Sequence, residues 1–215
     1  MKPIFISGIG TGIGKTIVAA IITEALKADY WKPVQAGYEP GTDSGLVASL
    51  LSNTESIIHP ETYRLKLAAS PHIAAQRENK RIELKKITDD FNRVDKKRPL
   101  VIEGAGGLMV PLNDQDFVID LIKMLDARLV LVSRNYLGSI NHSLMTAKIC
   151  RSYGLDVAGW VFNDQYMNYE SEIVHWSGYP ALFSLSLMDP LSKGTILAAA
   201  ESIPPEGMGY LYASL

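Results

Sequence analysis

The sequence has little cysteine, and this limits its covalent chemistry. Cys150 is the single cysteine among 215 residues, so no disulfide can form within the chain. We expect its thiol to be a small buried side chain in a reducing compartment rather than a reactive group.

Long apolar runs are also missing. None approaches the roughly 18 residues that a membrane-spanning helix requires. The short apolar stretch Ile4–Ile6 ends at Ser7 and Gly8, and is too short for the core of a signal peptide. We therefore expect a cytoplasmic protein.

A strong charge of either sign is absent as well. The net charge of −2 provides no broad basic surface for nucleic acid or an anionic membrane, so any phosphate site must be local. Apolar residues make up 47% of the chain and charged residues 20%, as is usual for a globular protein. Without repeats or linkers, residues 1–215 are expected to form a single domain.

Segments with strand character alternate with segments of helical spacing. The expected strands are Pro3–Ser7, Tyr30–Gln35, Leu100–Ile102, Leu129–Ser133, Val157–Phe162 and Ala181–Leu185. The expected helices are Lys15–Ala28, Asp43–Leu51, Glu83–Lys96, Asp116–Leu125, Ser139–Tyr153, Tyr169–Trp176 and Leu191–Glu201. The tail from Pro204, rich in Pro and Gly, is expected to be irregular. This alternation predicts an α/β fold with a mostly parallel sheet, helices on both faces and ligands at the carboxyl ends of the strands.

A glycine-rich loop, Gly8–Thr16, follows the first expected strand and opens the first helix. Its backbone N–H groups can turn inward around phosphate oxygens, and the helix N-terminus adds a positive dipole. Lys15 would reach the terminal phosphates of a nucleoside triphosphate, and the Thr16 hydroxyl would contact Mg²⁺. A common phosphate loop has its first glycine where Ile9 stands, so this loop is one residue longer, G-x5-G-K-T.

Two other interpretations of the loop are less consistent with its residues. A plain glycine-rich turn does not require Lys15 and Thr16 at the start of the helix. Gly8, Gly10 and Gly12 suggest a dinucleotide-binding loop, but the G-x-G-x-x-G spacing before the helix is missing. Partitioning-type ATPases carry a lysine early in this loop, where this chain has Ile9 and Gly10.

Three charged residues lie in or directly after expected strands or turns. Lys32, before Pro33, could stabilise a developing anion, although a lone lysine is more often exposed. Asp43 could bind Mg²⁺ or could cap a helix. Glu103 ends a buried strand, where a carboxylate without a metal or a partner would be costly. Thr16, Asp43 and Glu103 together are the expected ligands of a Mg²⁺ ion.

Together these motifs resemble the dethiobiotin synthetase family, a P-loop family of the biotin pathway. The matching segments cover nearly the whole chain: the G-x5-G-K-T loop, Lys32-Pro33-Val34, Asp43, Ser70-Pro71-His72, Glu103-Gly104-Ala105-Gly106-Gly107, Gly138-Ser139-Ile140-Asn141-His142 and Gly159-Trp160-Val161-Phe162-Asn163-Asp164. The resemblance implies a ligase that uses ATP and Mg²⁺. It would carboxylate 7,8-diaminononanoate with CO₂ and close the ureido ring, releasing dethiobiotin, ADP and phosphate.

The resemblance also implies roles for individual residues. The implied catalytic residues are Thr11, Lys15 and Lys32. The implied nucleotide-binding residues are Gly12, Ile13, Gly14, Lys15, Thr16, Ile17, Asp43, Glu103, Gly104, Ala105, Gly106, Asn163 and Asp164, with Asn163 facing the base. The implied substrate-binding residues are Ala36, Ser70, Gly107, Gly138 and Asn141. The site would lie at a homodimer interface, where the helix start Gly138–Asn141 of the partner receives the substrate carboxylate.

The sequence departs from the family pattern at four places, one of which is a link between the first helix and Lys32 that is shorter than usual. Gly12 stands where members often have an acidic residue, and Ala36 stands where many have serine or threonine. We expect Ala36 to lower affinity for the diamine without abolishing the chemistry. The segment Leu182–Leu187 replaces a glycine and a proline that often line the base pocket.

Two other functions fit these residues less well. A P-loop regulator of the partitioning type would carry the early lysine or a membrane helix. Cobyrinate and cobyric acid synthetases usually carry a further glutaminase domain with a nucleophilic cysteine, for which this chain is too short. For Ser70-Pro71-His72 and for Gly138–Asn141, the alternatives are a turn with a solvent-facing histidine and an ordinary helix cap.

Overall fold

Seven parallel strands form the central sheet of the structure, a computed structural model that describes residues 2–95, 97–164 and 166–213. Across the sheet the strands are β4 (Ile58–His59), β2 (Asp29–Trp31), β6 (Leu100–Glu103), β1 (Ile4–Gly8), β7 (Arg128–Arg134), β8 (Val157–Asn163) and β9 (Ala181–Leu185). The predicted parallel α/β fold is confirmed.

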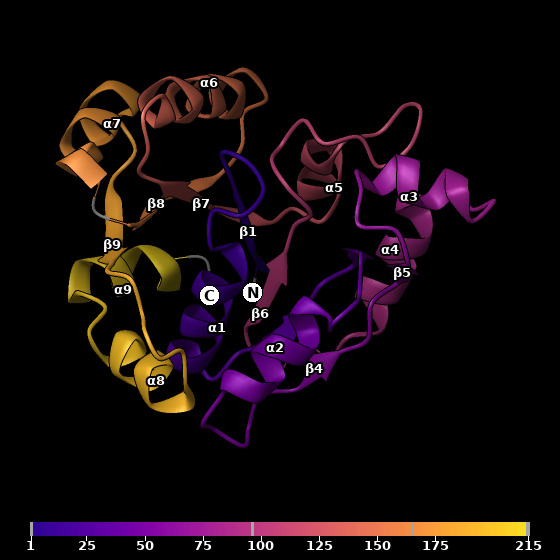
Figure 1. Cartoon of the computed structure of the whole chain (residues 1–215), viewed down its shortest axis with the longest axis horizontal. Coiled ribbons are helices and arrows are strands. Elements are labelled where there is room, and N and C mark those ends of the chain that lie inside the picture. Colours follow the sequence, from indigo (N-terminus) through magenta and orange to yellow (C-terminus); the bar gives the residue numbers. More distant parts are fainter. Residues whose placement is uncertain (1, 96, 165, 214–215) are drawn as a thin grey trace.

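Helices cover both faces of this sheet (Figure 1). Side chains alternate along a strand, so Ile4 and Ile6 of β1 point to one face and Phe5 to the other. Four helices pack on the Ile4 face: α1 (Lys15–Leu26), α2 (Asp43–Leu50), α8 (Lys193–Glu201) and α9 (Pro205–Tyr212). Five others contribute to the apolar cluster around Phe5: α3 (Pro71–Arg77), α4 (Leu84–Arg93), α5 (Val118–Met124), α6 (Ser139–Ser152) and α7 (Glu170–Ser177).

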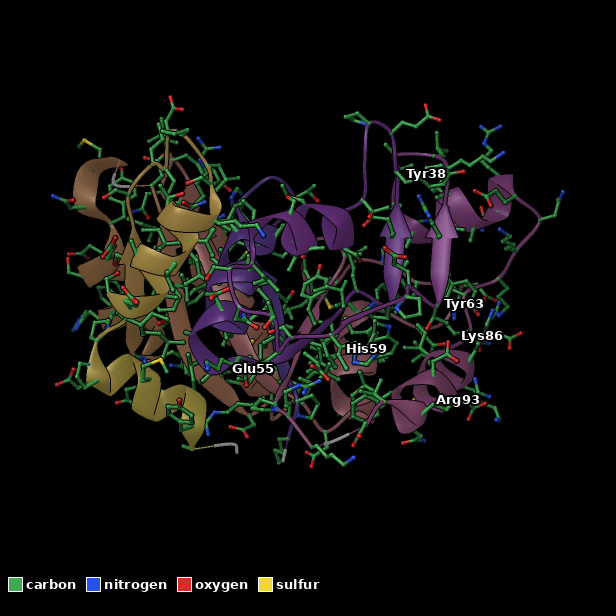
Figure 2. All side chains as sticks on the ribbon, turned by 90° about the horizontal axis from the view of Figure 1, so that it is seen from below. Tyr38, Glu55, His59, Tyr63, Lys86 and Arg93 are labelled. Atoms are coloured by element: carbon green, nitrogen blue, oxygen red, sulfur yellow. The ribbon has the colours of Figure 1, made fainter. Side chains whose placement is uncertain are left out.

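The expected single strand Tyr30–Gln35 is wrong. β2 ends at Trp31, and a separate strand, β3 (Val34–Ala36), pairs in parallel with β5 (Tyr63–Leu65) in a two-stranded sheet. Pro33 has no N–H for a sheet ladder, so the chain changes partners there. Figure 2 shows β3 and β5 side by side, with Tyr63 and Lys86 near one end of the pair.

The expected irregular tail is also wrong, because α9 begins at Pro205. A proline suits the first turn of a helix, where its missing N–H would have no intrahelical partner. Leu211 is fully buried and fixes this helix to the sheet. The prediction overlooked β4, β5 and α3, and the short 3₁₀ turn η1 (Tyr166–Asn168).

The predicted helices differ from those observed by one to three residues at their ends, as two of them illustrate. The stretch Glu83–Lys96 corresponds to α4, which ends at Arg93, and Lys96 lies outside the described residues. The stretch Asp116–Leu125 corresponds to α5, which begins at Val118. Within the part of the chain that the structure describes, no helix is both long enough and apolar enough to span a membrane.

Candidate active site

A cleft of about 750 Å³ lies where β1, β2 and β6 end. The phosphate loop follows β1, Lys32 follows β2, and Glu103 is the last residue of β6. Its volume suits a small-molecule site, and its place matches the rule for open α/β sheets. The predicted site residues that line it are Thr11, Gly12, Gly14, Lys15, Thr16, Ile17, Lys32, Ala36, Asp43, Ser70, Glu103, Ala105 and Gly106.

Asn163, the last residue of β8, supports the phosphate loop through a hydrogen bond. The Asn163 amide donates to the Ile13 carbonyl at 2.9 Å. Gly14 has a φ of 94°, in the left-handed region, and a Cβ there would lie 2.1 Å from Asn163 Nδ2. The loop therefore requires glycine at this position for both its backbone conformation and its contact with Asn163.

Lys15 is largely buried beneath the loop. Its ammonium donates to the Gly10 carbonyl at 2.6 Å. Burial lowers the pKa of Lys15 to about 8, and the nearby charge of Lys32 acts in the same direction. A phosphate group in the cleft would favour the charged form of Lys15, because an anion stabilises a neighbouring ammonium.

Lys32 bridges two carboxylates. Its Nζ lies 2.8 Å from Glu103 Oε1 and 2.7 Å from Asp43 Oδ2. Burial acts to lower the pKa of Lys32, but Glu103 and Asp43 outweigh it, and the pKa is raised. The alternative that Lys32 is an exposed surface lysine is wrong, because only 4% of the residue is exposed.

Glu103 is the most connected side chain of the cleft. Its Oε1 accepts hydrogen bonds from Thr16 Oγ1 at 2.9 Å and from Lys32, and its Oε2 accepts one from the Tyr30 hydroxyl at 2.7 Å. Glu103 is 1% exposed, so these three donors replace water as the partners of its carboxylate.

Asp43 is the first residue of α2, but it is not the capping residue. Thr42 occupies that position, and its hydroxyl accepts a hydrogen bond from the Gly45 backbone N–H at 3.0 Å. The alternative of Asp43 as a helix cap is therefore wrong. Its carboxylate instead contacts Lys32, while its backbone N–H donates to the Gln35 side chain at 3.1 Å.

The side chains of Thr16, Asp43 and Glu103 fit a Mg²⁺ ion by their donor chemistry. Each offers a hard oxygen, and Lys32 holds the two carboxylates toward each other. Within the described residues, no cluster of three or more His, Cys, Asp or Glu side chains could hold a metal ion.

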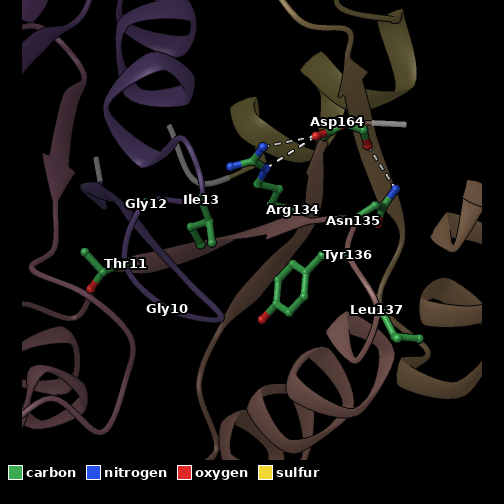
Figure 3. Close-up of a pocket in the computed structure, with 9 residues that line it drawn as sticks. All are labelled: Gly10, Thr11, Gly12, Ile13, Arg134, Asn135, Tyr136, Leu137 and Asp164. Carbon is green, nitrogen blue, oxygen red and sulfur yellow. Dashed lines mark hydrogen bonds and ion pairs between the residues drawn. The ribbon is translucent and has the colours of Figure 1, made fainter. Parts of the chain in front are cut away.

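A second cleft opens on the other side of the phosphate loop (Figure 3). Two predicted residues, Ile13 and Asp164, line this cleft rather than the first. The Arg134 guanidinium lies 3.3 Å from the Asp164 carboxylate, and the Asn135 side chain donates to the Asp164 carbonyl at 3.0 Å. The predicted nucleotide-binding residues are therefore divided between two clefts.

Five predicted residues line neither cleft. Gly104 bonds through its N–H to Ile6 in the sheet, and Gly107 and Asn163 pack against the phosphate loop. Gly138 caps α6, and Asn141 lies on its first turn; both are exposed. Within a single chain, Gly138 and Asn141 do not line the first cleft.

The segment Ser70-Pro71-His72 begins α3 and is not a simple turn. Ser70 lines the first cleft as the residue before the helix, and its hydroxyl lies 3.0 Å from His72 Nδ1. His72 is half-buried and lines a separate, smaller cavity.

Several residues in or directly behind the first cleft were not predicted from the sequence. Tyr30 bonds to Glu103, and the apolar wall comes from Val34, Leu46, Ala68, Ala69, Pro71 and Val110. Tyr30 could have been predicted, because it stands two residues before the candidate Lys32 in an expected strand, and residues two apart on a strand point to the same face. The apolar wall had none, because its members come from segments far apart in the sequence.

Comparison with known proteins identifies the family. A family model described as "AAA domain" matches residues 2–195. A relative from Cytophaga hutchinsonii, named ATP-dependent dethiobiotin synthetase BioD, is 50% identical over 203 residues, covering 93% of this chain and 96% of the relative. The chain belongs to the dethiobiotin synthetase family. A second synthetase of this name, from Christiangramia forsetii, is 46% identical over 173 residues, covering 80% of this chain and 81% of the relative.

Solved structures with a similar fold are distant in sequence. The MinC:MinD cell division protein complex of Aquifex aeolicus contains a chain with a TM-score of 0.60 and 12% identity, covering 95% of this synthetase and 98% of that chain. A ParA family ATPase from Chlorobium tepidum has a TM-score of 0.56 and 14% identity, covering 99% and 97%. These similarities establish the P-loop fold and nothing finer.

Proposed function

We propose that this synthetase uses ATP to carboxylate 7,8-diaminononanoate with CO₂ and to close the ring of dethiobiotin. The observation that carries the proposal is the convergence of two buried lysines, Lys15 and Lys32, on one cleft, in a chain related to synthetases over nearly its full length. Two fixed cations suit the transfer of a phosphoryl group, because the transition state spreads negative charge over the phosphate oxygens.

The reaction would proceed in three steps. One amine of the substrate takes up CO₂ to form a carbamate, releasing a proton. A carbamate oxygen attacks the γ-phosphorus of ATP, and ADP leaves. The second amine then attacks the carbonyl carbon of the mixed anhydride and loses a proton, and phosphate leaves with the bridging oxygen. The protein mainly positions these groups, since bringing reactants together accelerates such steps strongly.

Residues of the first cleft supply the contacts for these steps. Lys15 and Lys32 would bind the transferring phosphoryl group, and Thr11, at the edge of the loop, would bind the carbamate. Thr16, Asp43 and Glu103 would hold a Mg²⁺ ion, which would neutralise charge on the phosphate oxygens when bound. We propose that the apolar wall around Val34, Ala36 and Val110 receives the aliphatic chain of the diamine.

Recognition of the nucleotide base would involve Asn163. One hydrogen of its amide is bound to the Ile13 carbonyl, so the other amide hydrogen and the carbonyl oxygen would face the base. Asp164 follows directly and lies in the second cleft.

We further propose that one domain, residues 1–215, acts as a homodimer in the cytoplasm. The helix start Gly138–Asn141, in which Gly138 and Asn141 are exposed, would receive the substrate carboxylate of the partner's site, since a helix N-terminus favours an anion. This arrangement would explain why these residues lie outside the cleft of their own chain.

The activity is tested by incubating the purified protein with diaminononanoate, bicarbonate and Mg-ATP and measuring dethiobiotin by mass spectrometry. We expect product that depends on all three reactants. A folded, ATP-binding protein that forms none, and hydrolyses ATP equally well without the diamine, would instead favour a regulatory ATPase of the partitioning type.

A further inference from the structure

Tyr30 is fully buried and contacts Glu103 behind the first cleft, and it has no role in the proposed reaction steps. We propose that Tyr30 is a positioning residue that restricts Glu103 to one metal-binding oxygen and thereby favours Mg²⁺ over Ca²⁺. The inference rests on the proposed magnesium role of Glu103.

Strand pairing brings the two residues together. β2 and β6 are neighbours, with Tyr30 paired to Val101 in parallel register. Two residues further along the chain stand Lys32, directly after β2, and Glu103, the last residue of β6. Because side chains alternate along a strand, Glu103 points to the same face as Val101 and the paired Tyr30. The Tyr30 phenol therefore contacts Glu103 on its buried side, and Lys32 contacts it on the side that faces the cleft.

The two oxygens of Glu103 consequently have different surroundings. Oε1 is shared by Thr16 and Lys32, which both line the cleft, whereas Oε2 accepts the Tyr30 hydroxyl at 2.7 Å. Tyr30 is 0% exposed, so water does not compete for this bond. A carboxylate only accepts, so the phenol must be the donor, and this bond fixes Oε2 against a buried side chain that does not line the cleft.

This division of oxygens bears on which cation the site prefers. Mg²⁺ requires near-octahedral geometry and commonly uses single oxygens from one or two carboxylates, whereas Ca²⁺ has more ligands and readily takes both oxygens of one carboxylate. With Oε2 held by Tyr30, Glu103 offers the cleft one oxygen. Removal of the hydroxyl would release Oε2 and allow Glu103 to bind a larger ion through both oxygens.

The simplest alternative is that the Tyr30 hydroxyl only satisfies a buried carboxylate. Both explanations predict that loss of the hydroxyl lowers stability, because a buried acceptor loses its partner. They differ in metal selectivity, which a purely structural role would leave unchanged.

The test compares Tyr30→Phe with Tyr63→Phe in the full chain. Tyr63 is a matched control: it is also buried, and its hydroxyl accepts a hydrogen bond from the Glu83 backbone N–H at 2.9 Å, outside the cleft. Affinities for Mg²⁺ and for Ca²⁺ are measured by titration calorimetry on the ADP-loaded protein. We expect Tyr30→Phe to weaken Mg²⁺ binding about tenfold and to raise the affinity for Ca²⁺ relative to Mg²⁺. Tyr63→Phe should keep the wild-type ratio.

An unchanged ratio of the two affinities in Tyr30→Phe, or an equal change in Tyr63→Phe, overturns the inference. A second measurement uses the wild type and does not depend on the folding of the tyrosine variant. The infrared difference spectrum on adding Mg²⁺, compared with that of Glu103→Gln, should show Glu103 bound through one oxygen, with widely separated carboxylate stretches. A two-oxygen signature, or no difference assignable to Glu103, contradicts the inference.

These outcomes separate the inference from the proposed function. If the wild type forms no dethiobiotin, the proposed reaction fails, while the affinity ratio still reports on Tyr30. If dethiobiotin forms and the ratio does not change, the role of Tyr30 alone is wrong.

Discussion

Lys32 and Glu103 form a buried ion pair, with Nζ 2.8 Å from Oε1 and both side chains at most 5% exposed. Asp43 joins the pair at 2.7 Å from the same ammonium. Removal of Lys32 would leave two carboxylates facing each other without their cation, one of them fully buried. This relationship links the stability of the fold to the chemistry of the cleft.

Lys32→Ala should therefore destabilise the protein by about 3 kcal/mol, the usual effect of breaking a buried pair. The matched control is Lys27→Ala. Lys27 pairs with Glu55, which is labelled in Figure 2, but both side chains are more than half exposed, and loss of this pair should change stability by less than about 1 kcal/mol. Urea unfolding of the three proteins checks the difference, and equal losses in both variants would contradict a structural role for Lys32.

Lys15→Ala and Glu103→Ala should each lower turnover by about a hundredfold or more, because each removes a group aimed at the phosphates or their metal. Lys27→Ala should keep wild-type turnover, since Lys27 is exposed outside the cleft. Initial rates of dethiobiotin formation are compared after thermal melts have shown that each variant is folded. A near-normal rate in either cleft variant would remove that residue from the phosphate or metal site.

Glu24 should make the fold sensitive to acid. Its carboxylate accepts hydrogen bonds from Ser52 and Asn53. Burial acts to raise the pKa of Glu24, but these bonds outweigh it and lower the pKa below its ordinary value of 4.5. A lowered folded-state pKa contributes stability at neutral pH, and this contribution is lost as the pH falls below the ordinary value and through the folded one.

Glu24→Gln should accordingly be less stable than the wild type at about pH 7, with a gap that narrows at about pH 4 and below. Urea unfolding at several pH values measures this gap. Glu55→Gln, on the exposed surface, provides the control and should show little difference at any pH. A gap for Glu24→Gln that stays constant as the pH falls would contradict the assigned role of its charge.

If each active site is built by two chains, mixing two inactive variants should restore part of the turnover. Lys32→Ala damages the cleft, and Asn141→Ala damages the helix start that would serve the partner's cleft. After subunit exchange, half of the dimers should be mixed, each with one of its two sites intact, giving about a quarter of wild-type turnover. Mixtures that remain as inactive as the separate variants would contradict a site built by two chains.

The central sheet was predictable because its strands are short apolar runs separated by helical spacing. Leu129–Ser133 and Val157–Phe162 fall within β7 and β8. The prediction failed at Tyr30–Gln35, where a proline moves the chain into a second sheet, a change that depends on the distant strand β5.

The charged part of the cleft was predictable from its position after strands. The phosphate loop, Lys32 and Glu103 each follow or end a strand, and parallel strands end at the same edge. The contact of Tyr30 with Glu103 joins residues far apart in the sequence. The α2 cap is local, because Thr42 accepts a hydrogen bond from the Gly45 backbone N–H, but the sequence offers both Thr42 and Asp43 as capping residues. Gly138 and Asn141 lie outside the cleft of a single chain, so their predicted role depends on a partner.

The central claim is that a carbamate oxygen attacks ATP, and oxygen transfer tests it most directly. The diamine carbamate is formed from ¹⁸O-labelled CO₂ and mixed at once with protein and Mg-ATP, and the released phosphate is analysed by mass spectrometry. We predict one labelled oxygen in the phosphate for each dethiobiotin formed, because the bridging oxygen leaves with phosphorus. Dethiobiotin accompanied by phosphate whose new oxygen comes only from water would contradict the account.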